Sequence, residues 1–296
     1  MALMMIYVYA GCSSSTPPQS NPKQPKSAGT FNYQLNVANI RALLTLSGQY
    51  VLWLRMLGDT AWYAQPLTYW TVGSNSLDFL GTISLAHAPD SIETVFVSIE
   101  PPTVAASPTS ILMTGTFDST GDSASMSATN VGGAGDYSKA KASVIFTTKS
   151  PDTNQAKSEF FLMDFIRGVP TASVSNLPIP PHGWAYGLWV LDSNFYPLHK
   201  FFYGTFTNPD SSDFNPTSTD YPFPGGYNRR PLNDPGARLE VTLEPSFAVR
   251  GNHPAGPSPL TLLWVRLRQF IDYNDTLPLA NAWASSAPHG ILKIFK

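Results

Sequence analysis

The 296-residue sequence has one cysteine, few charged residues and no long apolar run. A single cysteine, Cys12, excludes an intrachain disulfide and any metal site built from cysteines. Charged residues make up 13% of the chain, roughly half the share usual in soluble domains, and the net charge is −2. Helical bundles need charged solvent faces and nucleic-acid-binding proteins need a basic field, so both classes are excluded.

The sequence also lacks the local patterns of catalytic and metal sites. Its five histidines form no His-x-His or His-x-x-x-His pair. There is no Gly-x-Ser-x-Gly nucleophile elbow and no glycine loop that would cradle a phosphate. We therefore expect no enzyme activity, no cofactor, no metal and no nucleic-acid partner.

What the chain has in abundance points to β-structure. It contains 27 prolines and 21 glycines, and 43% of its residues are hydrophobic. Short apolar runs alternate with clusters of Gly, Pro, Ser, Asn and Asp, as is typical of β-sandwiches and barrels. The sequence therefore predicts an all-β protein.

The N-terminal segment resembles the leader of a bacterial lipoprotein. Residues 1–11 are a short apolar run that ends in small residues, which is typical of a signal peptide and too short to span a bilayer. Tyr9-Ala10-Gly11-Cys12 resembles a lipobox, although Tyr9 stands where Leu is more usual and no basic residue precedes the run. Residues 12–30 have the composition of a disordered tether. We expect lipidation at Cys12, a membrane anchor and an extracytoplasmic location, either periplasmic or at the outer membrane.

Four motifs occur twice in the same order. The first series is Tyr50-Val51-Leu52-Trp53-Leu54, Leu80-Gly81-Thr82-Ile83, Val97-Ser98-Ile99-Glu100-Pro101 and Pro108-Thr109-Ser110-Ile111-Leu112. The second series is Tyr186-Gly187-Leu188-Trp189-Val190, Tyr203-Gly204-Thr205-Phe206, Val241-Thr242-Leu243-Glu244-Pro245 and Pro257-Ser258-Pro259-Leu260-Thr261. Strands persist while surface loops vary, so we expect two related β-sandwich domains. The expected boundaries are 31–120 for the first domain, 121–138 for a linker and 139–296 for the second domain.

The motifs also predict strands and their faces. In the first domain we expect strands at residues 31–37, 49–56, 79–84, 94–100 and 111–117. In the second domain we expect them at residues 142–148, 160–165, 184–191 and 290–295. Residues 262–273 fit either a helix or a strand, with a strand favoured at the start, and 208–235 is expected to be a functional loop or a packed cap.

Within the repeated strands, apolar residues share one face and the tryptophan lies on the other. Tyr50, Leu52 and Leu54 illustrate this, with Trp53 opposite. A proline follows both Glu100 and Glu244 and ends each strand. We therefore expect each carboxylate at a strand end, where it accepts a hydrogen bond from a neighbouring loop.

These repeated residues resemble the extracytoplasmic β-domain of anti-sigma-K factor proteins, in tandem, as found in uncharacterised bacterial lipoproteins. The resemblance covers most of residues 31–265 and is better in the second unit. It implies immunoglobulin-like β-sandwich domains outside the cytoplasm. The helical sigma-binding domain and the membrane helix of those proteins have no counterpart in these residues, so sigma-factor sequestration is not implied.

Two sets of residues are candidates for function. Glu100 and Glu244 have the residue types of a glycosidase pair, but equivalent positions in separate domains favour a structural role. Aromatic planes stack on sugar rings, so the candidate ligand-facing residues are the loop aromatics Trp62, Tyr63, Tyr69 and Trp70.

The favoured hypothesis is a non-catalytic envelope lipoprotein that acts in protein–protein interaction or sensing. It predicts a broad exposed apolar surface and no deep polar pocket. The alternative is a carbohydrate- or cell-wall-binding module, which predicts exposed and roughly coplanar Trp62 and Trp70.

Overall fold

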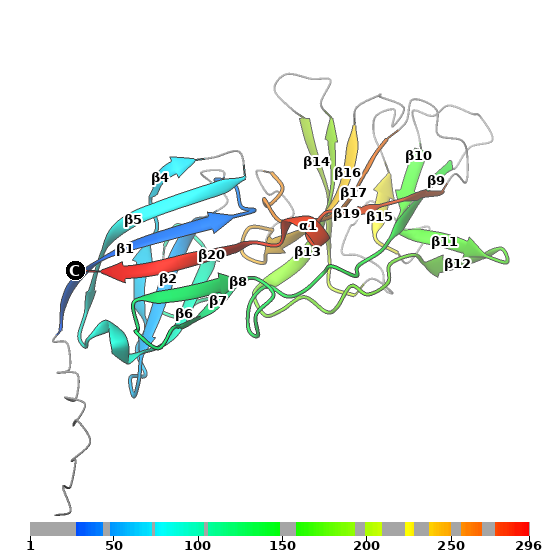
Figure 1. The fold of residues 1–296 in the computed structure, drawn as a ribbon. Coiled ribbons are helices and arrows are strands. Elements are labelled where there is room, and N and C mark those ends of the chain that lie inside the picture. The colour runs from blue at the N-terminus through cyan, green and yellow to red at the C-terminus, as the bar shows by residue number, and fades with distance from the viewer. Residues whose placement is uncertain are drawn as a thin grey trace, which may run out of the picture.

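The computed structural model describes ten stretches of the chain: residues 28–43, 48–72, 75–103, 106–148, 158–192, 199–208, 223–227, 237–249, 256–267 and 276–295. The expected signal peptide, Cys12 and most of the tether lie outside these residues, as does most of segment 208–235. The described residues form twenty strands, a 3-10 turn η1 (Pro89–Ser91) and one four-residue helix, α1 (Trp283–Ser286) (Figure 1). The all-β prediction is therefore confirmed. No helix in this part of the chain has the length and apolarity needed to cross a bilayer.

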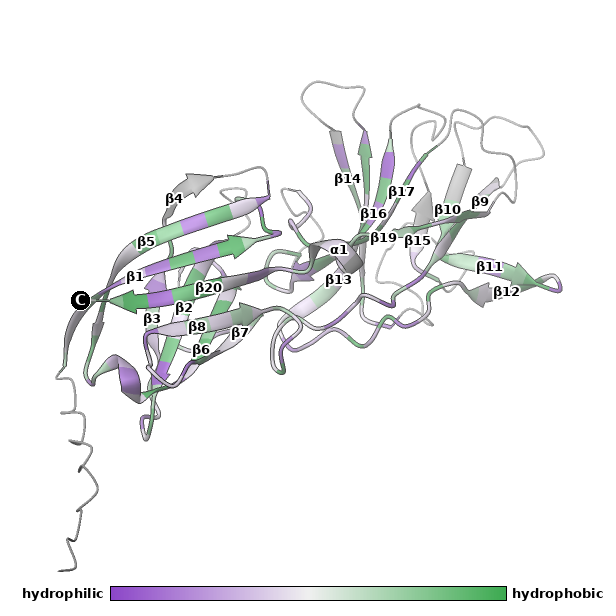
Figure 2. Cartoon of the chain, viewed as in Figure 1, coloured by the Kyte–Doolittle hydropathy of each residue, from purple (hydrophilic) through white to green (hydrophobic). Residues whose placement is uncertain are grey.

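The first lobe is one nine-stranded antiparallel sheet with the order β3-β2-β6-β7-β8-β20-β1-β5-β4 (Figure 1). Its strands are β1 (Gly29–Ala38), β2 (Gln49–Met56), β3 (Tyr63–Pro66), β4 (Tyr69–Val72), β5 (Ser76–Leu85), β6 (Ile92–Glu100), β7 (Ile111–Phe117), β8 (Ser123–Ser127) and β20 (His289–Phe295). Apolar and polar residues alternate along β1 and β5, visible as green and purple bands in Figure 2. This period of two places every second side chain in the core, as a half-buried strand requires.

The two edges of this sheet lie next to each other. β3 pairs with β2 at one edge and β4 pairs with β5 at the other, and only two residues separate Pro66 from Tyr69. Tyr50 of β2 also packs edge-on against Phe79 of β5, with ring centroids 6.0 Å apart. The sheet therefore folds back on itself into two layers around one core.

The C-terminal strand corrects the expected domain boundary. Residues 290–295 were expected to close the second domain, but β20 pairs with β1 on one side and β8 on the other, inside the first sheet. Leu292 and Ile294 on β20 are buried in that core. The chain thus returns to the first lobe after building the second.

The second lobe has a four-stranded and a five-stranded antiparallel sheet, with the orders β15-β10-β9-β18 and β14-β13-β16-β17-β19. The strands are β9 (Ser143–Thr148), β10 (Ser158–Phe161), β13 (Trp184–Asp192), β14 (His199–Phe206), β15 (Gly225–Tyr227), β16 (Arg238–Pro245), β17 (Thr261–Arg266), β18 (Thr276–Pro278) and β19 (Ala280–Asn281). Phe160 of β10 contacts Tyr203 of β14 at 4.7 Å between ring centroids, so the two sheets face each other. A separate hairpin, β11 (Met163–Ile166) and β12 (Val169–Ala172), projects from this lobe (Figure 1).

The repeated motifs occupy equivalent positions in the two lobes. Tyr50 pairs with Ile99 between β2 and β6, and Tyr186 pairs with Leu243 between β13 and β16. The next strand pair has an irregularity at the same motif position, between Val97 and Ser98 in one lobe and between Val241 and Thr242 in the other. Strand register and this irregularity are thus both repeated.

One motif pair is not equivalent. The motif Tyr203-Gly204-Thr205-Phe206 lies on β14, which hydrogen-bonds to β13. Its sequence counterpart, Leu80-Gly81-Thr82-Ile83, lies on β5, which pairs with β1 and β4 and not with β2. The Gly-Thr motif therefore marks a strand in each lobe but not the same strand.

The expected linker at 121–138 is part of the folded body. β8 lies within the first sheet, between β7 and β20. Beyond it, Ala134 and Tyr137 are fully buried, and Tyr137 packs edge-on against Tyr186 and Trp283. The glycine-rich composition was misleading here, because this segment is held to the rest of the protein by backbone hydrogen bonds and by the buried side chain of Tyr137.

The lobes meet through matching strand ends. The Trp184 indole donates to the carbonyl of Ile111 at 3.1 Å, and Ser110 Oγ donates to the carbonyl of Gly183 at 2.8 Å. Gly183 has φ +84°, and a Cβ there would lie 1.9 Å from the Thr109 carbonyl oxygen. Only glycine allows this approach, so the lobes are packed against each other rather than loosely tethered.

Candidate ligand-binding site between the lobes

The two repeated glutamates anchor loops. Glu100 is fully buried and accepts hydrogen bonds from the backbone N–H and the hydroxyl of Thr109, at 2.8 and 2.5 Å. Glu244 is 1% exposed and accepts from the backbone N–H of Ser258 at 2.9 Å. Thr109 and Ser258 occupy the same motif position, so both glutamates fix the loop that leads into the next strand. The expected loop hydrogen bond is confirmed in both lobes.

Glu244 has further partners. Trp189 Nε1 donates to its Oε1 at 3.0 Å, and the Thr242 hydroxyl donates to the same oxygen at 2.5 Å. Burial raises the pKa of Glu244 to about 7, although these donors act in the opposite direction. These donors all lie in the same lobe as the carboxylate, which is the arrangement of a structural group.

The structure describes the aromatic candidates only in part. Trp62 is half-buried: its ring lies 5.1 Å from the Phe96 ring, and the Arg55 guanidinium lies over it at 5.1 Å. Tyr63 is also half-buried, and its hydroxyl donates to Asp59 at 3.3 Å. The backbones of Tyr69 and Trp70 lie on β4, at the opposite edge of the sheet, and their side chains are outside the described part of the structure. Trp62 thus packs onto β2 and β6 of its own lobe, and whether the four residues bind a ligand remains a prediction.

A polar cleft lies where the two lobes meet. It consists of two adjoining hollows of about 480 and 220 Å³. Arg41 and Asn75 come from the first lobe, while Arg238 and Thr261 come from β16 and β17 of the second. Arg41, Arg238, Pro259 and Thr261 border both hollows, so they form one continuous site.

The floor of the cleft is the outer face of the five-stranded sheet. Along β16 the polar residues Arg238, Glu240, Thr242 and Glu244 alternate with apolar residues of the core. Since side chains alternate across a strand, these four polar groups lie in one row. Glu240 is 2% exposed, so the row is largely covered.

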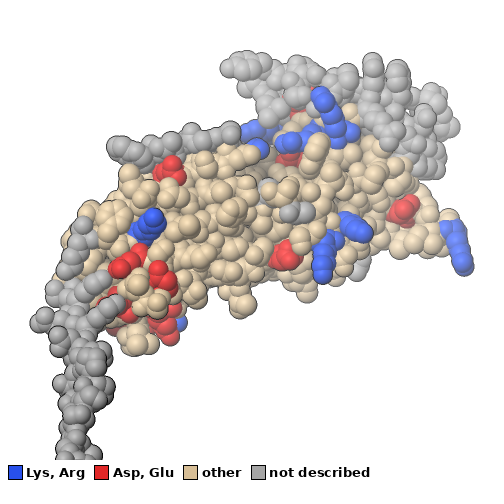
Figure 3. All heavy atoms as spheres, in the orientation of Figure 1, with Lys and Arg blue, Asp and Glu red and all other residues tan. Residues whose placement is uncertain are grey.

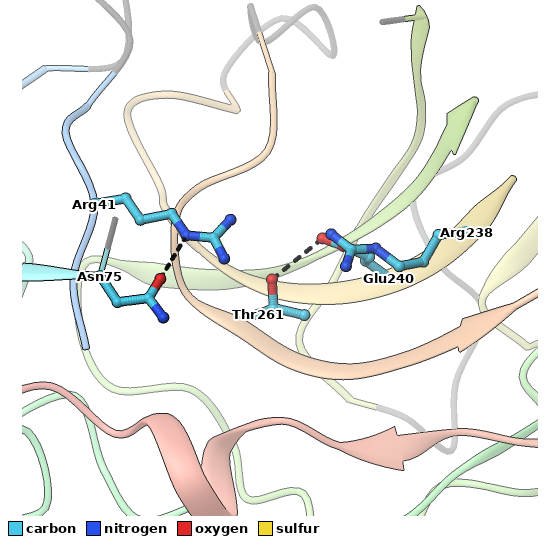
Figure 4. Close-up of polar contacts among 5 residues, drawn as sticks. All are labelled: Arg41, Asn75, Arg238, Glu240 and Thr261. Atoms are coloured by element: carbon cyan, nitrogen blue, oxygen red, sulfur yellow. Dashed lines mark hydrogen bonds and ion pairs between the residues drawn. The ribbon is translucent and has the colours of Figure 1, made fainter. Parts of the chain in front are cut away.

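Two arginines from different lobes converge above this row. Figure 4 shows Arg41 and Arg238 extending toward each other from opposite sides, with Thr261 between them. Arg41 Nε donates to Asn75 Oδ1 at 3.3 Å, and Thr261 Oγ1 donates to Glu240 Oε2 at 3.2 Å. Arg238 forms an ion pair with Glu240 Oε1. The carboxylate therefore holds Arg238, while the described hydrogen bond of the Arg41 guanidinium is to the amide of Asn75.

The described charges that border the cleft are predominantly positive. They are Arg41, Lys200 and Arg238, against the single carboxylate of Glu240. Burial raises the pKa of Glu240, partly offset by Arg238, Thr261 and Arg41. Figure 3 shows Lys and Arg side chains gathered over the second lobe near the lobe junction, on a surface that is otherwise mostly uncharged. The chain as a whole carries a net charge of −2, so this is a local field of opposite sign.

Two tryptophans complete the larger hollow. Trp264 is half-buried, and the Arg238 guanidinium lies 5.5 Å from its ring centroid. Trp283 is 2% exposed, and its Nε1 has no hydrogen-bond partner among the described residues. Asn39, Asn75 and Ser285 add amide and hydroxyl groups to the wall. The cleft thus offers cations, an indole surface and neutral polar groups.

The cleft was not predicted from the sequence. The alternation Arg238-Leu239-Glu240-Val241-Thr242-Leu243-Glu244 is visible in the sequence and indicates a strand with a charged outer face. No sequence motif around Arg41 predicts its role, because the fold of the first lobe places Arg41 next to the second lobe.

Among the described residues, no group of three or more His, Cys, Asp or Glu side chains is arranged to hold a metal ion. A scan against protein-family models finds no match for this chain, and comparisons with curated proteins and with solved structures find none either. The resemblance to anti-sigma-K β-domains thus rests on the repeated residues alone.

Proposed function

We propose that this chain is a non-catalytic binding protein of the bacterial envelope whose ligand occupies the cleft between the lobes. The observation that carries the proposal is the cleft itself: residues from both lobes converge on one polar hollow of about 480 Å³, within the size range of small-ligand sites. The buried glutamates contribute to the fold through their loop contacts, so no pair of them is available for acid–base chemistry on a bound ligand.

The envelope location rests on the N-terminal sequence. A lipid on Cys12 followed by the tether of residues 12–30 would hold the lobes away from a membrane surface, with the cleft open to envelope polymers. The resemblance to anti-sigma-K β-domains in lipoproteins favours the same placement and an immunoglobulin-like arrangement within each lobe. Of the two functions considered from the sequence, carbohydrate or cell-wall binding is the one that a polar cleft supports better.

The test is retention of the purified protein on isolated bacterial cell envelopes. Ser285 is exposed and borders the cleft, so Ser285→Trp fills the hollow without burying a polar group. Ser119→Trp is the matched control, because Ser119 is exposed on the β7–β8 loop of the first lobe. We expect wild type and Ser119→Trp to be retained equally and Ser285→Trp to be lost. Equal retention of all three proteins would contradict the proposal.

A protein partner is the second candidate function, favoured by the tip of the β11–β12 hairpin. Ile166 and Val169 are 58% and 62% exposed on either side of this projecting turn. A photo-crosslinking residue at position 169 should then capture a specific envelope protein in cells. Position 131 is the control, since Val131 is a fully exposed aliphatic residue of the first lobe. Equal crosslinking at both positions would remove this candidate.

A further inference from the structure

We infer that the cleft binds an acidic sugar, with Arg41 and Arg238 on the sugar's carboxylate, as a uronate unit of an acidic polysaccharide would require. The inference rests on the proposed function, because it names the ligand class of the same site. It is carried by three features of the cleft: two converging guanidinium groups, an indole wall and neutral polar groups around them.

The first feature is the convergence of two cations. Arg41 and Arg238 extend toward each other across the cleft (Figure 4). Like charges facing across a confined space repel, and the one carboxylate nearby, Glu240, is buried beneath Arg238. An anion between the two guanidinium groups would relieve this repulsion. Planar guanidinium groups match a carboxylate with two parallel N–H···O bonds.

Lys200 adds a third cation to the cleft. It borders the smaller hollow together with Arg41 and Arg238, so three of the four charged groups described at the cleft are cations. A neutral ligand would gain no charge–charge attraction from these cations. A cationic ligand would be repelled by it.

The second feature is the indole wall. Trp264 is half-buried with part of its surface at the larger hollow, and Arg238 holds its ring by a cation–π contact. A sugar ring that bears a carboxylate fits this arrangement. The sugar ring can pack on the indole while its carboxylate binds the arginine beside it. Trp283 adds a buried Nε1 donor without a partner in the described residues, beside the same hollow. Buried donors of this kind usually have a partner, so a ligand oxygen is a fitting one.

The remaining wall matches hydroxyl groups. The amides of Asn39 and Asn75 and the hydroxyls of Thr261 and Ser285 border the larger hollow, and groups of both kinds can donate and accept hydrogen bonds. A sugar presents hydroxyls of the same dual character. A fatty acid would engage the arginines but has no hydroxyl groups to offer this part of the wall.

The experiment is isothermal titration calorimetry with two probes that share one sugar backbone and differ in whether their carboxyl groups are charged. One is tri-galacturonate, and the other is its methyl ester, in which the carboxylates are neutral. We expect tri-galacturonate to bind the wild-type protein, with affinity falling at high salt, and the methyl ester to bind on the order of 10- to 100-fold more weakly.

Variants assign the binding to the cleft. Arg41→Gln should weaken tri-galacturonate binding on the order of 10- to 100-fold and leave methyl-ester binding unchanged. Lys200→Gln is a second variant of the same kind. Arg167→Gln is the matched control, because Arg167 is an exposed arginine at the hairpin tip. It should bind like wild type.

Each outcome has a defined meaning. Equal binding of the two probes, an unaffected Arg41→Gln variant, or no binding of either probe to wild type would overturn the acidic-sugar inference. Failure of Ser285→Trp to reduce envelope retention would overturn the proposed function instead. Envelope retention that depends on Ser285 but not on Arg41 would keep the site and reject its acidic ligand.

Discussion

The indole Nε1 of Trp189 donates to Oε1 of Glu244 at 3.0 Å, on the outer face of the five-stranded sheet. In the first lobe the equivalent tryptophan, Trp53, donates instead to Ser98 Oγ at 2.7 Å. Both tryptophans are buried on the face opposite the main core. The repeat therefore keeps the donor and changes the acceptor, which places one additional carboxylate interaction in the second lobe.

Glu244 makes stability depend on pH. Burial raises its pKa to about 7 from an ordinary value of 4.5, so the folded protein binds this proton more tightly than the unfolded chain does. The protonated group contributes on the order of 3 kcal/mol to the free energy of unfolding. This contribution is fully present below about pH 4.5 and is lost as the pH rises through about 7. Urea denaturation of wild type and Glu244→Gln at pH 5 and pH 8 measures this. Wild type should lose more stability between the two values than the variant, and equal losses would refute the assignment.

Gly183 tests the packing of the lobes. Gly183→Ala places a methyl group against the Thr109 carbonyl, so we expect a loss of about 3 kcal/mol or more in the free energy of unfolding. Gly168→Ala is matched in backbone conformation, with φ +80° against +84°, but a Cβ there has no neighbour within 4 Å. It should cost only about 1 kcal/mol of backbone strain. Similar losses at both positions would mean that the lobes do not press together at Gly183.

The C-terminal strand should stabilise the first lobe. Leu292 is fully buried on β20, whereas its neighbour Ile291 is 48% exposed. Leu292→Asp buries an unpaired carboxylate and should cost about 3–5 kcal/mol, with proteolysis appearing first in residues 28–127. Ile291→Asp on the same strand should stay within about 1 kcal/mol of wild type. Cleavage confined to the second lobe in Leu292→Asp would contradict the observed pairing.

Lipidation is tested by mass and by membrane partitioning in a bacterial host. The mature protein is expected to begin at Cys12 and to carry acyl chains, and Cys12→Ala should lose both the added mass and the membrane fraction. An unlipidated wild-type protein that keeps residues 1–11 would remove the argument for a membrane anchor.

Much of the fold could be predicted from the sequence because it depends on local patterns. Alternation and β-branched residues identified β1, β2, β5, β6 and β7 to within a few residues, and the start of segment 262–273 is a strand, as favoured. The Pro101 and Pro245 positions correctly placed both glutamates beside a loop. Whether the lobes are immunoglobulin-like stays a prediction.

The rest depended on contacts between distant residues. The sequence of strand 289–295 predicts a strand but not its partners, since any sheet with an unpaired edge could pair with it. Residues 121–138 look like a linker in the sequence because the burial of their one large aromatic side chain, Tyr137, depends on contacts with the second lobe. Arg41 and Arg238 are 197 positions apart in the sequence, so no local pattern could bring them to one cleft.

The most direct test of the acidic-sugar cleft is an NMR titration of the seven tryptophan indole N–H signals with tri-galacturonate, assigned by single Trp→Phe variants. Binding in the cleft predicts that the signals of Trp264 and Trp283 shift while those of Trp53 and Trp62 stay in place. Shifts at Trp62 and Trp70, with Trp264 and Trp283 unchanged, would place the ligand on the loop aromatics instead and contradict the account.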